Sequence, residues 1–518
     1  MALNEMQQLA VDTTEGPLLI LAGAGSGKTT VLVNRVEHII SSRLATPWQV
    51  LAITFTNKAA GELRERLVNA IGDEANDIWA YTFHSCCSRI LRRFGERIGY
   101  TNHFTIYDTD DSRRVMKQCQ KQLGIEDKLI NHKSILAEIS RAKDSLISPD
   151  EYKQTSQNDF RKSKIAECYE MYQKELKKSD AMDFDDIIFN TVKLLEENED
   201  VRDLYQTQFK YVMVDEYQDT NEVQDRIFET LTRERGNCFL VGDVKQSIYR
   251  FRLADPGIFL EKYREFVPAG EAEPGQGRKI LLSENFRSGG EILEAANHVF
   301  RCTMSASVGG LEYGEAEALR EGIPHRPLPQ SAVELHGIQL TPGPGGEAAV
   351  KYEAEAQFVA ERIEALLGEP AMIRQGEDLR PVRPGDIVIL LLSPGSCAGY
   401  YRRALEARGI PVSAGAGGSV LDTGEAAVLR SFLQVLDNPL QDIPLEAVLA
   451  SPVFRFTADH LGSIRAACPE GALFEALTRA GETGDTQAGA FLDLVQSLRQ
   501  AARLENLTRL LEEIYART

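Results

Sequence analysis

The segment PLLILAGAGSGKTTVLVNRVEHII, residues 17–40, constrains the fold of this chain most strongly. Its apolar run at 18–21 predicts a short buried strand, and apolar residues at helical spacing from Leu32 onward predict a helix. The connecting loop, AGAGSG, alternates glycine with small residues, so backbone N–H groups can close around phosphate oxygens at the start of that helix. A strand, a glycine-rich loop and a helix in this order predict an α/β fold with a nucleotide at the edge of its sheet.

The residues after the loop indicate how the nucleotide is held. We expect Lys28 to reach the β and γ phosphates of ATP and the Thr29 hydroxyl to hold Mg²⁺. The pattern G-x-x-x-x-G-K-[ST] is broken once, because Ala22 stands where the first glycine belongs, but alanine is small and the context is intact. A glycine-rich turn in a structural unit would not explain a lysine followed by two threonines. The expected ATP-binding residues of this segment are Ala22, Gly23, Ala24, Gly25, Ser26, Gly27, Lys28, Thr29 and Thr30.

The segment YVMVDE, residues 211–216, predicts a second buried strand that ends in two acids. Ligands bind at the carboxyl ends of strands in open α/β sheets. We therefore expect Asp215 to complete the Mg²⁺ shell beside Thr29, and Glu216 to act as the base that orients and deprotonates water. An acidic pair after a strand is by itself more often a solvated strand end, so this interpretation depends on the phosphate loop.

Three further apolar runs end in polar clusters, at 50–60, 238–252 and 279–288. Polar residues repeated at strand ends, with helices between the strands, predict a doubly wound parallel sheet. In the second run Gln246 is a candidate sensor of the γ phosphate. In the third, Phe286 offers an aromatic ring and Arg287 a charge that suits phosphoryl transfer. On local sequence alone, a surface ion pair explains that arginine equally well.

Seven motifs in order carry a family resemblance: LNEMQ, AGAGSGKTT, TFTNKAA, TFHS, VDEYQDTN, VGDVKQSIYRFR and NFRS. Together they resemble those of the UvrD/Rep/PcrA-type superfamily 1 DNA helicases. The resemblance implies two RecA-like domains that close on ATP and Mg²⁺ and move 3′ to 5′ along single-stranded or 3′-tailed DNA, in repair or recombination. It also implies that Gln7 reads the adenine, that Phe286 stacks on it, and that Arg287 comes from the second domain. The implied DNA contacts are Thr56, Asn57, Phe83, His84, Tyr249, Phe251 and Arg252.

Two of these implied DNA contacts have common structural explanations. A phenylalanine such as Phe83 is more often part of a core, and a histidine such as His84 is more often structural than chemical. The net charge of −19 is unfavourable for a nucleic-acid binder. A local groove can nevertheless hold DNA while the outer faces stay acidic. Eight scattered cysteines and the absence of an evident signal peptide or membrane-spanning run predict a cytoplasmic protein with reduced thiols and no membrane partner.

The resemblance changes along the chain. Residues 1–222 resemble PcrA/UvrD, and residues 238–518 resemble the helicase/nuclease subunit AddA, which would imply an AddB-like partner. Residues 1–250 hold 16 lysines and 11 glycines, against 3 lysines and 29 glycines in 251–518, so either the domain or the sequence background changes. Two late family motifs, roughly T-x-H-x-x-K-G-L-E and Y-V-A-x-T-R-A, are not found. The alternative function is therefore an ATP-binding, DNA-holding fragment without productive unwinding.

The expected fold class is α/β: a P-loop NTPase with RecA-like parallel sheets, the first complete and the second partial, and helical insertion domains. The second RecA-like domain is expected to continue through the apolar segment DIVILLLS and to stop short of its later part, with the chain ending inside a second insertion. The expected boundaries are 1–98 and 206–277 for the first RecA-like domain, 99–205 for its helical insertion, 278–440 for the second RecA-like domain, and 441–518 for the start of a second insertion.

Overall fold

The computed structural model describes residues 3–232, 236–248, 254–273, 275–324, 328, 332–339, 347–369, 371–375, 378–413 and 423–518. The chain forms two compact units. The first comprises Met1–Ser283, Met304–Glu317 and Val428–Thr518, and the second comprises Glu284–Thr303 and Ala318–Ala427. Within the described part of the chain, no helix is long and apolar enough to cross a membrane.

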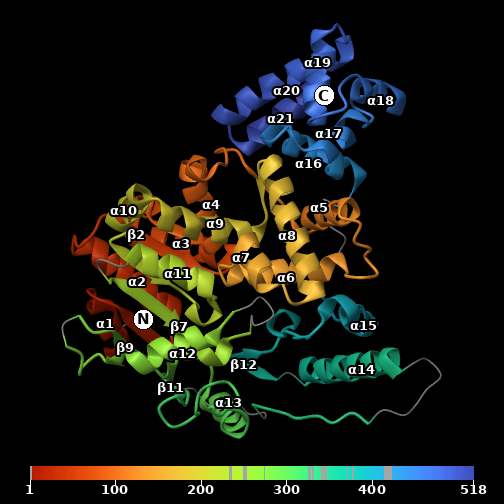
Figure 1. Ribbon diagram of the computed structural model, residues 1–518. Helices are drawn as coiled ribbons and strands as arrows, with labels where there is room; N and C mark the ends of the chain where they lie inside the picture. Colours follow the sequence, from red (N-terminus) through yellow and green to blue (C-terminus); the bar gives the residue numbers. More distant parts are fainter. Residues whose placement is uncertain are drawn as a thin grey trace. The chain divides into compact units, whose positions relative to one another are not determined.

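A seven-stranded sheet forms the centre of the first unit, with the order β3-β2-β6-β7-β1-β9-β8 (Figure 1). All of its neighbouring strands run parallel. The sheet confirms the predicted α/β fold class, and β1 and β6 are the strands expected before the phosphate loop and the acidic pair. The strands are β1 (Leu18–Ala22), β2 (Val50–Thr54), β3 (Trp79–Thr82), β6 (Tyr211–Val214), β7 (Cys238–Gly242), β8 (Val267–Pro268) and β9 (Arg278–Leu282).

Helices cover both faces of this sheet, and alternate strand residues enter two separate cores. Leu18 and Ile20 pack with apolar residues of the helices on one face. Leu19 and Leu21 pack with those on the other. The first face carries α1 (Glu5–Asp12), α2 (Lys28–Ser41) and α3 (Asn57–Ile71). The second carries α4 (Phe83–Phe94), α9 (Phe184–Glu197), α10 (Glu199–Gln208), α11 (Glu222–Thr232) and α12 (Pro256–Glu265).

The segment 278–282 belongs to the first unit, which differs from the predicted start of the second domain at 278. As β9 it pairs along its whole length with β1, from Leu18 opposite Arg278 to Ala22 opposite Leu282. Ile280 and Leu282 are buried in the same core as the phosphate-loop helix. Pairing with β1 buries this strand, so the first unit continues to Ser283 before the chain leaves it.

The helical insertion has its own core, which is formed by buried residues of α5 (Thr109–Gln122), α6 (His132–Asp144), α7 (Pro149–Thr155) and α8 (Phe160–Lys178). A short parallel pair, β4 (Thr105–Ile106) with β5 (Ala181–Met182), closes its base. Lys143, which is 1% exposed, ties α6 to the start of α9: its Nζ lies 2.6 Å from Asp183 and 2.9 Å from Asp186. This buried ion cluster joins the insertion to a helix that packs on the sheet.

The second unit holds no large sheet among its described residues. It contains α13 (Gly290–Thr303), α14 (Glu347–Gly368), α15 (Pro394–Glu406) and two short strand pairs, β10 (Glu284–Asn285) with β11 (Arg320–Glu321) and β12 (Met372–Gln375) with β13 (Asp378–Pro381). The apolar segment 387–392 forms no strand pair. Its odd-numbered residues pack on α14 and α15, whereas Val388, Leu390 and Leu392 are 76%, 90% and 103% exposed.

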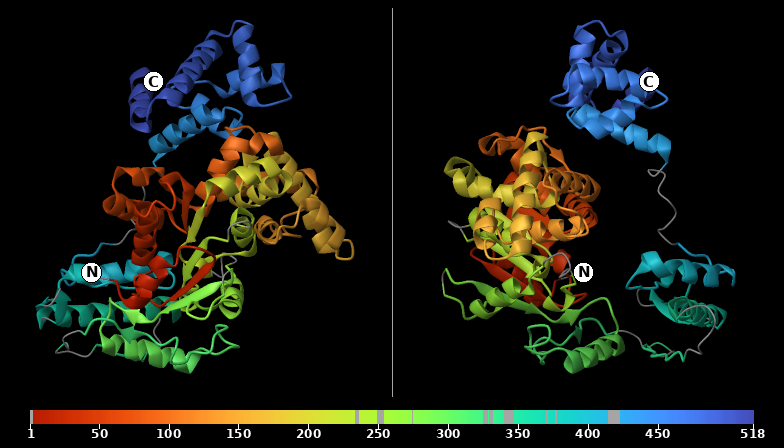
Figure 2. Two further views of the ribbon diagram at one scale, coloured as in Figure 1. Left: turned by 90° about the vertical axis from the view of Figure 1, so that its left-hand side faces the viewer. Right: turned by 45° about the vertical axis from the view of Figure 1, so that its right-hand side comes forward.

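The C-terminal residues form an all-helical bundle with a single core, seen in blue in Figure 2. The bundle begins earlier than the predicted boundary at 441, because Phe432, Val435 and Leu436 of its first helix are buried in this core. Its helices are α16 (Gly424–Asp437), α17 (Asp442–Leu449), α18 (Ala458–Ala467), α19 (Leu473–Glu482), α20 (Thr486–Leu504) and α21 (Leu507–Arg517).

Candidate nucleotide and DNA sites

The loop between β1 and α2 has the backbone shape of a phosphate cradle. Gly25 and Gly27 have φ angles of 68° and 83°, in the left-handed region that favours glycine. A Cβ at Gly27 would also come within 3.0 Å of Gln7 Nε2. Because Gly27 is the N-cap of α2 and has no side chain, it does not cap the first N–H groups of the helix. This end of α2 therefore suits an anion.

Gln7 lies against the phosphate loop and is 5% exposed. Its Nε2 donates to the Ser26 carbonyl oxygen at 2.9 Å, and its Oε1 accepts from Asn4 N–H at 3.0 Å, within the capping box that begins α1. Both ends of the amide are thus engaged by named partners. The structure places Gln7 against the phosphate loop, and its contact with adenine stays a prediction.

Three predicted catalytic residues, from segments far apart in the sequence, meet above the sheet edge. Lys28 Nζ lies 2.8 Å from Glu216 Oε2 and donates to Gln246 Oε1 at 3.2 Å. Lys28 begins α2, Glu216 follows β6, and Gln246 ends the turn after β7. The order of the parallel strands explains this meeting, because β6, β7 and β1 are neighbours and their carboxyl ends share one edge.

Asp215 and Thr29 form the second pair of this site. The Thr29 hydroxyl donates to Asp215 Oδ2 at 3.5 Å, and Asp215 is 6% exposed. Burial, and then the adjacent Glu216 carboxylate, raise the pKa of Asp215 to about 6, against the opposing effect of Lys28. A buried carboxylate beside a hydroxyl fits a hard divalent cation such as Mg²⁺. In the described residues no cluster of three or more His, Cys, Asp or Glu could hold a metal alone, and Mg²⁺ commonly relies on one or two carboxylates plus phosphate oxygens.

The contacts that hold Glu216 in place were not predicted from the sequence, which suggested only that Gln218 and Asp219 link the acidic pair to the domain cleft. Glu216 has a φ of 55°, an uncommon backbone conformation for a residue with a side chain. Gln218, 1% exposed, donates from Nε2 to Glu216 Oε2 at 2.8 Å and accepts at Oε1 from Asp243 N–H at 2.9 Å. A Cβ at Gly242 would lie 2.4 Å from Gln218 Oε1, so a larger residue there would displace this bridge. A polar residue two positions after the acidic pair was the available signal.

Asp243 supports Gln246 in the same way. It is fully buried, pairs with Lys245 Nζ at 2.8 Å and accepts from Gln246 Nε2 at 2.7 Å. The predicted γ-phosphate sensor is therefore held by a paired carboxylate at the end of β7.

The comparison with protein families agrees with this geometry. The family described as the UvrD/REP helicase N-terminal domain matches residues 3–267, which include the phosphate loop, the acidic pair and Gln246. The chain belongs to the UvrD/REP helicase family.

Named relatives of this family match the whole chain or a large part of it. It is 33% identical over 523 residues to the ATP-dependent DNA helicase PcrA of Bacillus subtilis, covering 100% of this chain and 65% of the relative. PcrA of Leuconostoc citreum is 44% identical over 298 residues, or 57% of this chain and 39% of the relative. The chain thus spans about two thirds of the Bacillus protein. The match to PcrA of Bacillus subtilis includes residues 238–518, for which a resemblance to AddA was predicted, and these comparisons give no support to an AddB-like partner.

Phe286 and Arg287 belong to the second unit of this UvrD/REP-type chain. Asn285 Oδ1 accepts from the N–H groups of Arg287 and Ser288, at 2.8 and 2.7 Å, which fixes the turn that carries them. Arg287 is exposed, and the Phe286 ring packs against Gly322, where a Cβ would lie 2.6 Å from it. Their roles toward the nucleotide stay predictions.

The predicted DNA contacts fall into three groups. Thr56 and Asn57 are exposed at the start of α3, after β2. His84 is half-buried with its ring against Phe184, and burial lowers the pKa of its imidazole. The prediction for Phe83 is corrected: the ring is 2% exposed and packs against other phenylalanine rings in the core, so no face is open to a base. Tyr249, Phe251 and Arg252 lie outside the described residues.

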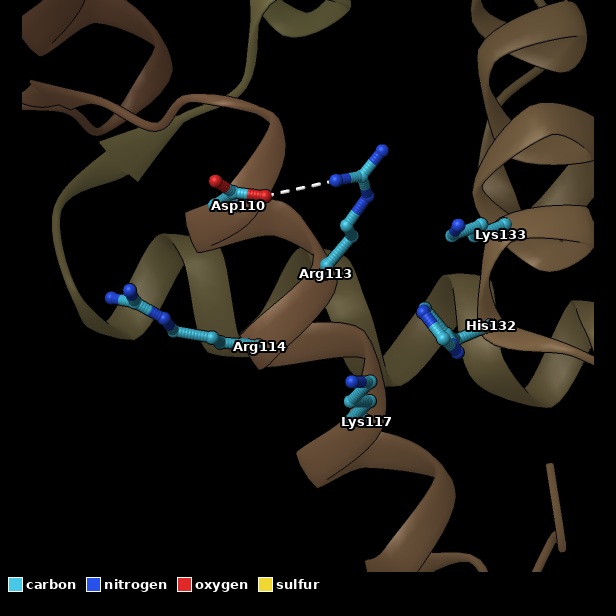
Figure 3. A pocket seen from close by; sticks show the side chains of 6 residues that line it. All are labelled: Asp110, Arg113, Arg114, Lys117, His132 and Lys133. Atoms are coloured by element: carbon cyan, nitrogen blue, oxygen red, sulfur yellow. Dashed lines mark hydrogen bonds and ion pairs between the residues drawn. The ribbon is translucent and has the colours of Figure 1, made fainter. Parts of the chain in front are cut away.

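A cationic pocket between α5 and α6 was not predicted (Figure 3). Its volume is about 450 Å³, and the residues that line it are Asp110, Arg113, Arg114, Lys117, His132 and Lys133. Arg113 pairs with Asp110 at 2.9 Å, whereas Lys117 and Lys133 have no recorded ion pair among the described residues. In Figure 3, Lys117 of α5 faces the two α6 residues His132 and Lys133, and Arg114 projects from the other side of α5. Although Asp127 lies near Lys117 and pairs with His132 at 2.7 Å, the excess of cationic side chains that line the pocket favours a phosphate-bearing ligand.

Proposed function

We propose that this chain is the motor part of an ATP-dependent DNA helicase that hydrolyses ATP and moves 3′ to 5′ along single-stranded DNA. The observation that carries the proposal is the meeting of Lys28, Glu216 and Gln246 at one sheet edge, beside Asp215 and Thr29. A small-molecule kinase would have no need for the motifs VDEYQDTN and QSIYRFR. Relatives named as ATP-dependent DNA helicases support the same assignment.

Each residue of the site has a definite task in this proposal. Lys28 neutralises phosphate charge, and its present partner Glu216 then accepts a proton from the attacking water. Gln246 orients the γ phosphate, while Gln218 keeps the Glu216 carboxylate directed at the site. Thr29 and Asp215 would hold Mg²⁺, which would supply positive charge for phosphoryl transfer.

Stimulation of ATP hydrolysis by single-stranded DNA is the test of this function. We expect DNA to raise the hydrolysis rate of the parent chain, and Lys28→Ala to lower it by about 10²–10³-fold, since one preorganised phosphate contact is lost. Lys193→Ala, an exposed change on α9, is the matched control and should keep the parent rate. No stimulation by DNA, or equal rates for Lys28→Ala and the parent, would contradict the proposal. ATP binding without turnover in the parent would favour the alternative of a DNA-holding module.

The pocket of α5 and α6 is proposed as a contact for the DNA backbone. Lys117→Ala combined with Lys133→Ala should weaken DNA binding and make the slope of log K against log salt shallower by about 1–2, because each lysine releases about one counterion. The double variant Lys178→Ala/Lys193→Ala changes the net charge equally on α8 and α9 and should retain the parent slope. Fluorescence anisotropy of labelled DNA at several salt concentrations measures both quantities. Equal slopes for the two double variants would exclude the pocket as a DNA contact.

A further inference from the structure

One hydrogen bond connects the helical insertion to the segment that follows Glu216. Asn221 Nδ2 donates to Asp144 Oδ1 at 2.7 Å, across 77 positions of sequence. Asn221 directly precedes α11 and is 7% exposed, and Asp144 is the last residue of α6. The hydrogen bonds described above for Asp215 and Glu216 do not involve Asn221 or Asp144. This contact is therefore separate from the nucleotide site already described.

Asp144 is in an unfavourable position for a carboxylate. It ends α6, where the partial negative charge of the helix C-terminus disfavours an acid. Burial, and then the nearby Asp185, raise the pKa of Asp144 to about 7. The hydrogen bond from Asn221, and then the positive charge of Lys143, favour its charged form there. A residue kept at a stability cost points to a role in function.

Asn221 uses both ends of its amide. Oδ1 accepts from Gln224 N–H at 3.0 Å, in the first turn of α11, while Nδ2 donates to Asp144. Aspartate at this position would keep the oxygen that the helix needs and would lose the donor. Asn221→Asp therefore selectively removes the contact between Asp144 of α6 and the segment that follows Glu216.

The segment from Glu216 to Asn221 is short and tightly held, so a shift at one end reaches the other. Tyr217 and Gln218 are each 1% exposed and Thr220 is fully buried. The Glu216 carbonyl oxygen accepts from Asp219 N–H at 3.0 Å. At the far end, α6 is anchored by the buried ion cluster of Lys143 described above. Close packing of this kind transmits displacements instead of absorbing them.

We propose that Asp144 is a positioning residue that holds Glu216 in its working place through Asn221. The inference rests on the proposed function, since it assigns a role within ATP hydrolysis. In this arrangement the helical insertion fixes the geometry of the base through Asp144, which lies outside the predicted phosphate site.

A charge-swap series tests this role. Asn221→Asp removes the amide N–H that donates to the Asp144 carboxylate and should lower kcat about 10- to 100-fold, with KM for ATP nearly unchanged. Adding Asp144→Asn should restore kcat to within about threefold of the parent, because the new amide at 144 can donate to the new carboxylate at 221. Glu196→Gln is the matched control: it removes the ion pair of Arg226 with Glu196, at 2.7 Å between α11 and α9, and should leave kcat unchanged. Failure of the swap to restore kcat would overturn the proposal.

Hydrogen–deuterium exchange separates this proposal from the proposed function. We expect faster exchange across residues 215–224 in Asn221→Asp, and exchange like that of the parent in the double variant Asn221→Asp/Asp144→Asn. The thermal midpoint of unfolding should not follow these changes in exchange. If the parent chain hydrolyses no ATP, the proposed function is wrong. The exchange of residues 215–224 would still test whether Asp144 holds Glu216 in position. The role of Asp144 would be overturned if exchange were unchanged in Asn221→Asp. It would also be overturned if the single and the double variant both lost kcat in proportion to a lowered thermal midpoint of unfolding.

Discussion

Replacing Glu216 with glutamine is expected to slow ATP hydrolysis by about 10²–10⁴-fold, the usual contribution of a general base. Glutamine has nearly the same size, so its side chain can still accept from Gln218 and Lys28, which lie 2.8 Å from the native carboxylate. Only the ability to take a proton from water is lost. ATP should therefore bind with an affinity close to that of the parent. Phosphate release measures the rate, and titration with a fluorescent nucleotide analogue measures the affinity.

Glu229, an exposed acid of α11, provides the control for this change. Glu229→Gln alters an exposed carboxylate of α11, next to Arg226 and Lys262, and should keep the parent rate. A Glu216→Gln variant that hydrolyses ATP within about twofold of the parent would show that another group accepts the proton. A variant that no longer binds ATP would show instead that Glu216 serves to place Lys28.

Arg287→Ala is expected to lower DNA-stimulated hydrolysis by about 10³-fold or more, as the loss of an arginine finger does in related phosphoryl-transfer enzymes. The guanidinium would stabilise charge that develops on the transferred phosphate, so ATP affinity should change little. Single-turnover hydrolysis in the presence of single-stranded DNA measures the effect directly.

Two companion variants make the Arg287 result specific. Arg287→Lys keeps the charge but loses the planar fork, and should recover only part of the rate. Arg402→Ala removes an exposed arginine of α15 in the same compact unit and should have no effect. If Arg287→Ala hydrolyses ATP at the parent rate, Arg287 is not an arginine finger. The alternative, that it forms a surface ion pair, would then be favoured.

Local patterns were enough to predict several residues that meet at the candidate nucleotide site. A strand, a glycine-rich loop and a lysine at the start of the following helix are enough to predict a phosphate-binding loop. The acidic pair of β6 then follows from the rule that ligands lie at the carboxyl ends of parallel strands. Lys28, Glu216 and Gln246 were each identified from their own segment, and the structure brings the three together.

Features that depend on non-local partners could not be predicted. Nothing within 278–282 shows that it pairs with β1, because strand pairing is decided by residues far apart in sequence. Phe83 has the same local sequence whether its ring meets a base or the neighbouring Phe228, at a centroid distance of 4.9 Å. The cationic pocket needs α5 and α6 side by side, and the bridge through Gln218 needs β7 beside β6.

The first compact unit is assembled from chain segments that are synthesised at different times. Its C-terminal part, Val428–Thr518, follows Ser283 after about 145 residues, which a ribosome takes about 7–29 s to add. Asn438 in this part donates to Thr105 Oγ1 at 2.7 Å, at the base of the helical insertion. During synthesis the insertion therefore spends many seconds with this surface uncovered, at a stage when the parallel sheet is already complete.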